Sequence, residues 1–265
     1  MTHPFRQSRF FRPYLPEATL SEHGNIRSLH LGTETIQSSM NTANPSELVL
    51  SYSRAMMGWL LFADPLPERI LQIGLGGGSF VRWLAVHLPQ AAQTCIEINP
   101  QVIRIARTSF CLPPESEHFQ IVEADGAEYV QIFNSNVDLI LVDGFDGVQI
   151  IDDLVAEPFF HDCFHALSDG GIFATNWWSG DKRYPQSVAR LRQVFGGRVL
   201  EIPAETHGNI AVFAFQAAPK DLRLASLKKH AETLSQQYGL NFLRMLADAK
   251  ARNPHNGKAF QFKAA

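Results

Sequence analysis

The middle of the chain alternates short apolar runs with segments of helical character. Each apolar run is four to six residues long, which suits a buried strand, and turn residues separate it from the next helical segment. This order predicts a doubly wound α/β domain, in which crossover helices connect the strands of a parallel sheet. The predicted strands are residues 70–73, 93–97, 119–122, 137–142 and 172–176, and the predicted helices are residues 79–88, 99–111 and 153–167.

Before this alternation the pattern is that of a small β-structure. Three short segments are separated at Gly24 and Gly32, as is typical of antiparallel strands joined by tight turns. Asn44 and Pro45 then open a predicted helix that runs to about residue 62. The predicted strands are residues 18–22, 26–31 and 34–38, and an arm of residues 1–17 precedes them.

After the alternation, two apolar segments predict a hairpin-like pair at the far edge of the sheet, at residues 198–202 and 210–215. A helical tail follows at residues 219–251, and one apolar stripe of this tail is expected to pack in the core or in a dimer. We therefore expect three parts. They are the arm and β-appendage at residues 1–44, the main α/β domain at 45–218, and the helical tail at 219–265.

A glycine-rich turn follows the first predicted strand of the sheet. Gly74, Gly76 and Gly78 lie between that strand and the next predicted helix. Glycine permits positive φ and a close approach of a ligand, while the helix N-terminus adds free N–H groups and partial positive charge. Glu97 ends the second strand, where a carboxylate can accept both hydroxyls of a ribose. The loop and this acid together predict a nucleoside-binding site.

Two further strands end in acidic residues. Asp125, with Gly126 after it, follows the strand at residues 119–122, and Asp143 and Asp146 follow the strand at residues 137–142. Ligands of open α/β sheets bind at the carboxyl ends of the strands. We therefore expect Asp125 and Asp143 to meet the glycine loop and Glu97 in one crevice.

Composition narrows the class of partner. The chain has 265 residues, is 45% hydrophobic and carries a net charge of −3, so it lacks the basic surface that nonspecific nucleic-acid binding requires. Small molecules are the expected partners, and no apolar run is long enough for a signal peptide or a membrane anchor. Cys95, Cys111 and Cys163 fit reduced core thiols, which indicates a cytoplasmic protein.

The order of these motifs resembles the spermidine synthase family of polyamine aminopropyltransferases. The likeness covers about residues 18–215 and is carried by the glycine loop, Cys95-Ile96-Glu97-Ile98, Ala124-Asp125-Gly126 and Val142-Asp143-Gly144-Phe145-Asp146. It implies the Rossmann-like, seven-stranded sheet of S-adenosylmethionine-dependent methyltransferases, with a small N-terminal β-appendage. It also implies transfer of an aminopropyl group from decarboxylated S-adenosylmethionine, as co-substrate, to a polyamine such as putrescine. A homodimer without a tightly bound cofactor is the expected form.

The same resemblance assigns roles to single residues. Asp143 would be the catalytic carboxylate, which suits an amine that must lose a proton to attack a sulfonium carbon. Asp146 would lie near the acceptor amine, Glu97 would hold the ribose, and Asp125 would hold the adenine amino group. The other cofactor-binding residues that the resemblance implies are Gln37, Gly74, Gly76, Gly78 and Gly126.

Two positions depart from the family pattern. Gly77 stands where members usually carry an Asp that meets the ammonium end of the decarboxylated donor. Arg54 belongs to Tyr52-Ser53-Arg54, where members have Tyr-His-Glu or Tyr-Gln-Glu. The donor could therefore keep its carboxylate, as S-adenosylmethionine itself does, with Arg54 as its partner.

Three other functions stay open at this point. A methyltransferase would use the same fold and a different sulfonium carbon. An NAD-dependent oxidoreductase would also use a glycine loop and a later acid, although Asp125 would then lie where the adenine binds. A nucleoside-binding protein without activity is the third. His161 and His165 have the spacing of metal ligands on one helix face but lack a third ligand, so no metal site is predicted.

Overall fold

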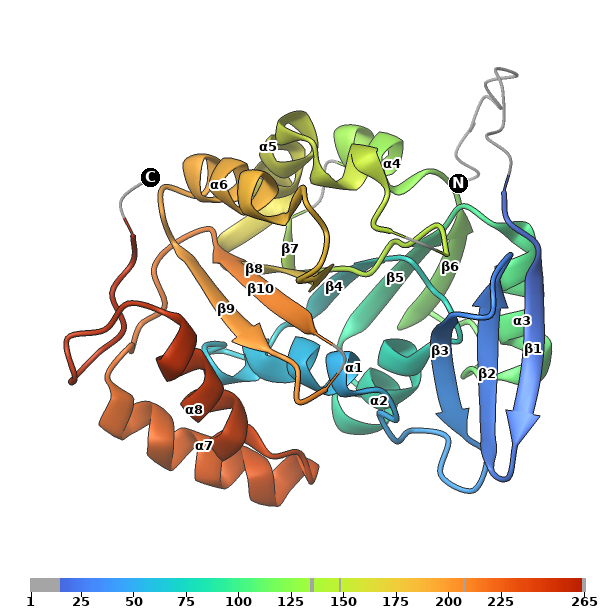
Figure 1. The fold of residues 1–265 in the computed structure, drawn as a ribbon, viewed down its shortest axis with the longest axis horizontal. Coiled ribbons are helices and arrows are strands. Elements are labelled where there is room, and N and C mark those ends of the chain that lie inside the picture. The colour runs from blue at the N-terminus through green and yellow to red at the C-terminus, as the bar shows by residue number, and fades with distance from the viewer. Residues whose placement is uncertain (1–14, 134–135, 148, 207, 264–265) are drawn as a thin grey trace.

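The computed structural model describes residues 15–133, 136–147, 149–206 and 208–263. These residues form one seven-stranded sheet with helices on both faces, and a separate three-stranded sheet lies at one end (Figure 1). The first fourteen residues of the predicted arm lie outside the described part of the chain. Within that part, no helix has the length and hydropathy that a bilayer span requires.

The large sheet is mostly parallel. Its strand order is β6-β5-β4-β7-β8-β10-β9; the first five of these run parallel, and β10 is antiparallel to both β8 and β9. The strands are β4 (Arg69–Ile73), β5 (Ala92–Glu97), β6 (Phe119–Glu123), β7 (Val137–Val142), β8 (Leu167–Trp178), β9 (Val199–Pro203) and β10 (Asn209–Phe215). The predicted parallel sheet with an antiparallel pair at its far edge is therefore confirmed.

The order of the strands determines where a ligand can bind. β5 and β6 lie on one side of β4, whereas β7 and β8 lie on the other side. Since the chain changes direction between β4 and β7, the loops after these strands diverge and leave a crevice at their carboxyl ends.

The small sheet is a three-stranded antiparallel meander. It consists of β1 (Ala18–His23), β2 (Ile26–Leu31) and β3 (Ile36–Asn41). The first two strands agree with the prediction to within one residue. The third begins and ends later than the predicted residues 34–38, and its pairing with β2 has a register shift between Leu29 and His30.

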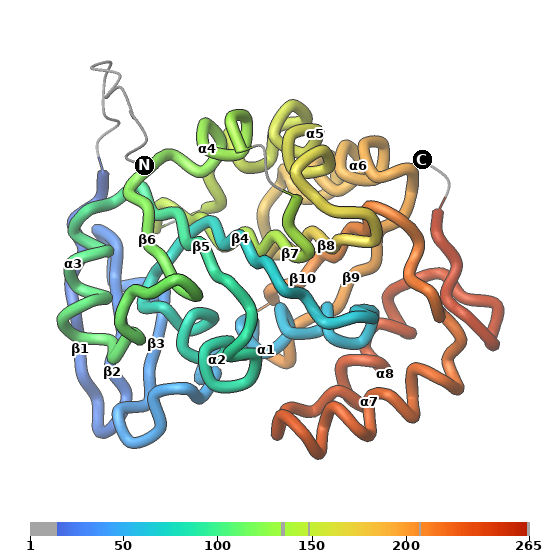
Figure 2. Tube along the Cα trace, turned by 180° about the vertical axis from the view of Figure 1, so that it is seen from behind, coloured from blue at the N-terminus to red at the C-terminus, as the bar shows by residue number. Residues whose placement is uncertain are grey.

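The helices form two layers. Figures 1 and 2, which are opposite views, both place α4, α5 and α6 on one face of the large sheet and α1, α2, α7 and α8 on the other. The helices are α1 (Ser51–Met56), η1 (Met57–Leu61), α2 (Ser79–His87), α3 (Pro100–Ser109), α4 (Gly126–Ile132), η2 (Asp152–Val155), α5 (Glu157–Ala166), α6 (Tyr184–Val194), α7 (Leu224–Tyr238) and α8 (Phe242–Arg252).

Several predicted helix boundaries were wrong. The helix expected from Asn44 begins only at Ser51, because Asn41 forms a turn that holds the backbone of Ala43 and Asn44 in hydrogen bonds. The predicted helix at residues 153–167 is two elements, η2 and α5, and Pro158 lies in the first turn of α5. The tail is two helices, and it breaks at Gly239, which has a φ of +69°. No helix was predicted at α4 or α6.

The apolar stripe of the tail belongs to the core. Leu227, Ala231, Leu234 and Tyr238 are buried in one cluster with residues of η1, α2 and β10. Buried Cys95 and Cys163 agree with the predicted core thiols, but Cys111 is exposed, so that prediction was wrong for Cys111. The proposed division at residues 44 and 218 stays a prediction.

Candidate active site

The glycine loop connects β4 to α2 at the switch point of the sheet. Gly74 has a φ of +92°, and a Cβ at this position would overlap the backbone carbonyl of Asp143. The Gly74 N–H donates to the Ile96 carbonyl oxygen at 2.8 Å. Only glycine fits this close approach of three strand ends, so the loop holds the ends of β4, β5 and β7 together.

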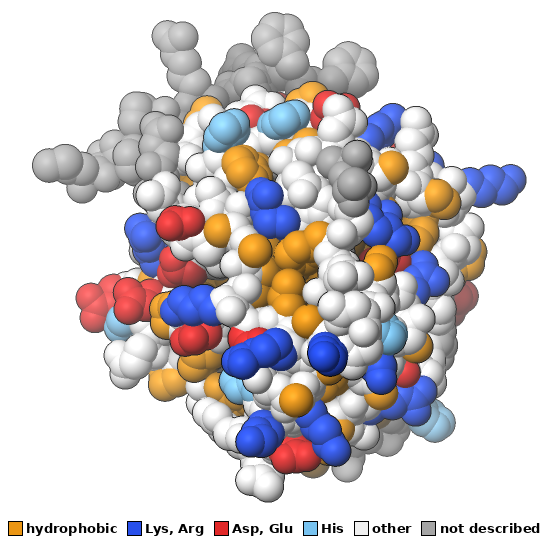
Figure 3. All heavy atoms as spheres, turned by 90° about the vertical axis from the view of Figure 1, so that its left-hand side faces the viewer, with side chains coloured by type: hydrophobic (Ala, Val, Ile, Leu, Met, Phe, Trp, Pro, Cys, Tyr) orange, Lys and Arg blue, Asp and Glu red, His pale blue; other side chains and the backbone are white. Residues whose placement is uncertain are grey.

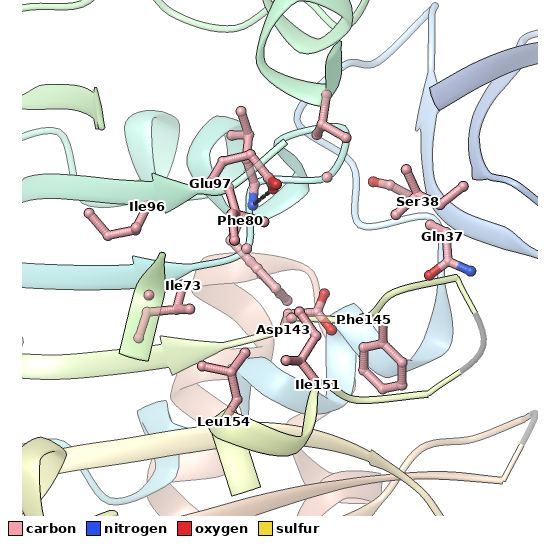
Figure 4. Close-up of a pocket in the computed structure, with 18 of the residues that line it drawn as sticks. Gln37, Ser38, Ile73, Phe80, Ile96, Glu97, Asp143, Phe145, Ile151 and Leu154 are labelled. Carbon is pink, nitrogen blue, oxygen red and sulfur yellow. Dashed lines mark hydrogen bonds between the residues drawn. The ribbon is translucent and has the colours of Figure 1, made fainter. Parts of the chain in front are cut away.

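Glu97 lies at the end of β5 and faces the same loop. Its two carboxylate oxygens accept backbone N–H groups of Leu75 at 2.9 Å and Asn99 at 2.8 Å. Burial raises the pKa of Glu97, and these backbone hydrogen bonds partly counter that effect. The carboxylate is thereby fixed in direction at the pocket wall (Figure 4).

Asp125 is the N-cap of α4. Its Oδ1 accepts the N–H groups of Ala127 at 2.8 Å and Glu128 at 3.1 Å. Gly126 follows it, and a Cβ there would overlap the side chain of Ile73. The cap therefore sets the direction of Asp125 where β6 turns into α4.

Asp143 follows β7 and points into the pocket (Figure 4). Asn176 of β8 donates its Nδ2–H to Asp143 Oδ1 at 2.9 Å, and Asn209 of β10 in turn donates to Asn176 Oδ1 at 3.0 Å. Burial raises the pKa of Asp143 to about 6, although the hydrogen bond from Asn176 and the neighbouring Tyr52 hydroxyl favour its charged form. This carboxylate is consequently a stronger base than an ordinary aspartate.

The β-appendage contributes a part of the pocket wall. Gln37 of β3 lines the pocket and donates its Nε2–H to the Gly147 carbonyl oxygen at 3.1 Å. The Tyr52 hydroxyl of α1 donates to the Gln37 carbonyl oxygen at 3.0 Å. Burial and the nearby Asp143 charge raise the pKa of Tyr52 well above its usual value. The appendage is therefore a part of the site.

The structure brings most of the predicted site residues to one pocket. Gly78 does not line it; this glycine precedes α2 with a φ of +74° and packs against Leu112. Asp146 does not line it either, because it is exposed and its Oδ1 accepts the Gln149 N–H at 2.9 Å. The predicted residues that line the pocket are Gln37, Gly74, Gly76, Glu97, Asp125, Gly126 and Asp143.

The two departures from the family pattern have local explanations. A Cβ at Gly77 would lie 2.7 Å from the Phe110 ring and 2.9 Å from Ser38 Oγ, so no side chain fits there without movement. Arg54 does not line the pocket. Its guanidinium donates to the Leu48 carbonyl oxygen at 2.9 Å and to the Val49 carbonyl oxygen at 2.7 Å. It also forms an ion pair with Glu205, in the loop between β9 and β10. The expectation that Arg54 meets a donor carboxylate was therefore wrong.

Sequence reasoning missed several polar residues of the site. Asn176, Asn209 and the pocket-lining pair Ser38 and Ser79, whose hydroxyls lie 3.3 Å apart, were not predicted. Asp153 also lines the pocket and was not predicted. Asn176 gave a signal in the sequence, because it is a polar residue that closes the apolar predicted strand at residues 172–176.

The pocket is acidic. Among the described residues, those that line it include four carboxylates, Glu97, Asp125, Asp143 and Asp153, and no Lys, Arg or His. A low-dielectric cleft with charges of one sign attracts ligands of the opposite sign. The site therefore favours cations and disfavours a ligand with a free carboxylate or phosphate.

A second apolar area lies on the side face in Figure 3, where basic and acidic side chains both surround it. Within the described residues, no group of three or more His, Cys, Asp or Glu side chains could hold a metal ion, and His161 instead pairs with Glu157 at 3.8 Å.

Comparisons with known proteins agree with this geometry. The family model described as "Spermine/spermidine synthase domain" matches residues 49–195. A polyamine aminopropyltransferase of Neisseria meningitidis (strain Z2491) is 64% identical over 258 residues, which are 97% of this chain and 98% of that protein. Another, from Chromobacterium violaceum, is 56% identical over 95% of this chain and 96% of that protein.

The fold is also shared with solved structures. A probable spermidine synthase from Corynebacterium glutamicum superimposes with a TM-score of 0.70 over 83% of this chain and 85% of that one, at 18% identity. At this identity the likeness concerns the fold alone. From the family match and the near full-length relatives we conclude that the chain belongs to the spermine/spermidine synthase family.

Proposed function

We propose that this protein is a polyamine aminopropyltransferase that uses decarboxylated S-adenosylmethionine and a diamine such as putrescine. The observation that carries the proposal is the acidic pocket, in which Asp143 shares one cavity with Glu97 and Asp125. The near full-length likeness to polyamine aminopropyltransferases supports it. Both proposed substrates are cations at neutral pH, as the pocket requires.

The proposed reaction is a single displacement. The acceptor nitrogen attacks the aminopropyl carbon that is bonded to sulfur, the C–S bond breaks, and its electron pair stays on sulfur, so neutral methylthioadenosine leaves. The nitrogen loses one proton, which Asp143 accepts. A base with a pKa of about 6 is better matched to this transfer near neutral pH than an ordinary aspartate.

The other residues would bind and orient the substrates. Glu97 would accept the ribose hydroxyls, Asp125 the adenine amino group, and Gln37 would close the donor pocket from the β-appendage. Tyr52 lies beside Asp143 and would help to orient the attacking nitrogen. Correct placement of the two reacting atoms is worth several kcal/mol in reactions of this kind, about 7 or more.

The pocket also bears on the choice of donor. S-adenosylmethionine carries a carboxylate that its decarboxylated form lacks. Since Arg54 is engaged elsewhere and no basic side chain of the described residues lines the pocket, a donor carboxylate would be left without a partner. This favours the decarboxylated donor over the methyltransferase alternative. We further propose that the protein is a homodimer and that it is cytoplasmic. The free thiols of Cys95 and Cys163 fit the second proposal, because they are typical of a reducing compartment.

The test is a direct assay of product. The purified protein is incubated with either donor and a panel of diamines, and methylthioadenosine is measured by mass. We expect product from the decarboxylated donor, and we expect Asp143→Asn to lower the rate by about 100-fold or more while methylthioadenosine still binds. Absence of product with every amine, or a clear preference for S-adenosylmethionine, would overturn the proposal.

A further inference from the structure

Arg82 lies near the start of α2, directly behind the glycine loop. It is only 3% exposed and does not line the pocket. Its Nη1 donates to the Gly77 carbonyl oxygen and, at 2.9 Å, to the carbonyl oxygen of Phe110, which follows α3. Its Nε donates to the Pro45 carbonyl oxygen at 2.5 Å, in the segment that joins the β-appendage to α1. One side chain therefore joins the glycine loop to two neighbouring segments.

The guanidinium of Arg82 is a buried charge that forms no ion pair with a carboxylate of the described residues. Burial lowers the pKa of Arg82 to about 10, so the group still keeps its charge at neutral pH. The Phe110 ring adds a cation–π contact, with its centroid 5.9 Å from the guanidinium carbon. Within the described part of the chain, Nη2 is buried without a hydrogen-bond partner. A buried cation with incomplete partners costs stability, so packing alone does not explain an arginine at this position.

The contact with Arg82 fixes one peptide group of the glycine loop. The peptide between Gly77 and Gly78 directs its carbonyl oxygen at Arg82, while its N–H donates to the Leu75 carbonyl oxygen at 2.8 Å. Gly76 has a φ of +51° and Gly78 a φ of +74°. Since glycine residues change conformation easily, this loop keeps one conformation only where its peptide groups are held on both sides.

The donor side of the pocket depends on that conformation. Leu75, Gly76 and Ser79 line the pocket on either side of the held peptide. The Leu75 N–H also orients the Glu97 carboxylate, which it meets at 2.9 Å. None of the hydrogen bonds described for the guanidinium goes to the segment that follows β7. A change at the guanidinium should therefore affect the nucleoside and not the acceptor amine.

We propose that Arg82 is a positioning residue for the donor, whose guanidinium holds the glycine loop in the conformation that binds the nucleoside. This inference rests on the proposed function and adds a residue that touches neither substrate. A planar guanidinium donates in several directions at once, whereas the ammonium of lysine is a point charge at the end of a flexible chain. Arg82→Lys therefore keeps the positive charge but loses the fixed set of contacts.

The experiment compares the two substrates in Arg82→Lys. We expect the KM for decarboxylated S-adenosylmethionine to rise about tenfold, while kcat and the KM for the diamine change less than about twofold. Calorimetry should show the same loss of about tenfold in affinity for methylthioadenosine. Hydrogen exchange of the backbone amides of residues 74–79 should be faster in the variant, because the loop opens more often. Arg82→Gln carries the same expectations and replaces Arg82→Lys if the lysine variant does not fold.

Arg198→Lys is the matched control. Arg198 also donates its guanidinium to two backbone carbonyl oxygens, those of Phe215 and Gln216, each at 2.9 Å, and it does not line the pocket. Both lysine variants should lose stability in urea, but Arg198→Lys should keep the donor KM and the methylthioadenosine affinity of the wild type. An equal loss of that affinity in both variants would overturn the proposal. So would a rise of the diamine KM as large as that of the donor KM, because it would show a general loss of structure.

Calorimetry separates this inference from the proposed function, because it requires no turnover. If the wild type makes no product, the proposed function fails, while a loss of methylthioadenosine affinity confined to Arg82→Lys still supports the positioning role. If this affinity and the donor KM do not change, the inference fails even when the enzyme is active. A wild type that binds no methylthioadenosine would overturn the inference as well.

Discussion

Replacing Asn176 by leucine would change the acidity of the proposed base while keeping the size of its neighbour. The pKa of Asp143 is about 6 because burial raises it, while the hydrogen bond from Asn176 and the neighbouring Tyr52 hydroxyl lower it. A hydrogen bond to a charged group contributes about 1.5–3 kcal/mol, and about 1.4 kcal/mol corresponds to a tenfold change in acidity. Allowing for water that replaces part of the lost bond, the pKa of Asp143 in Asn176→Leu should be about 7.

The assay is the pH dependence of kcat/KM for the diamine between about pH 5 and pH 9. The pKa values of the acceptor amines are about 10, so amine titration adds the same slope to the kcat/KM profiles of both proteins in this range. We expect the acid limb of the profile near pH 6 in the wild type and about one pH unit higher in Asn176→Leu, with the two rates converging above about pH 8.5.

Asn209→Leu is the matched control, because Asn209 donates to Asn176 and not to Asp143. Its acid limb should move by less than half as much. A limb that stays at the same pH in Asn176→Leu, with a rate lowered equally at every pH, would refute the reasoning. Asn176 would then serve only to shape the pocket, and the base would be another group.

Three further predictions concern packing, capping and buried charge. Gly77→Ala places a Cβ 2.7 Å from the Phe110 ring. It should lower the free energy of unfolding, measured in urea, by about 1–3 kcal/mol, and Phe110→Leu should partly restore the loss. If no stability is lost, position 77 has room for a side chain. Asp125→Ser should keep the N-cap of α4, whereas Asp125→Ala should lose it and with it about 1 kcal/mol of stability. Both variants should bind methylthioadenosine more weakly in calorimetry, and unchanged binding would exclude the adenine contact. Glu201→Gln removes the buried partner of Arg252, 2.8 Å away, and should cost about 2–4 kcal/mol at pH 7. Burial raises the pKa of Glu201, but its hydrogen bonds and Arg252 have the larger effect, so the pKa is lowered overall. The stability advantage of the wild type over Glu201→Gln should therefore shrink as the pH falls below about 4.5. A stability difference that does not change with pH would contradict the ion pair.

The main part of the site could be predicted because its residues follow parallel strands. Glu97, Asp125 and Asp143 each end or follow a short apolar run, and the carboxyl ends of parallel strands lie at one edge of a sheet. Neither the order of the strands nor their distances had to be known. The pocket therefore followed from local pattern plus one rule of topology.

The supporting contacts could not be predicted, because they depend on pairing between distant segments. Asn176 meets Asn209 only because of the register of β8 and β10. This register pairs Asn176 with Ala211, so Asn209, two residues before Ala211, lies close enough for its side chain to reach Asn176. α4 is seven residues long, too short for a helical period to emerge from the sequence. The turn at Asn41 likewise depends on side-chain hydrogen bonds that compete with a helix and leave no periodic pattern.

The two departures from the family pattern lead to the same conclusion about charge. Gly77 is closed off by Phe110 and Ser38, so the loop cannot supply a carboxylate for the donor ammonium. Arg54 is held by backbone carbonyl oxygens, so it adds no positive charge to the pocket. The negative charge of the site is therefore concentrated at the ends of β5, β6 and β7 and at the start of η2. If the proposed function holds, the ammonium of the donor must be received from the β7 side, where it shares the field of Asp143 with the acceptor. Donor and acceptor would then compete for one set of carboxylates. A substitution that changes the selectivity for either substrate would therefore have to lie on the β7 side of the pocket and not in the glycine loop.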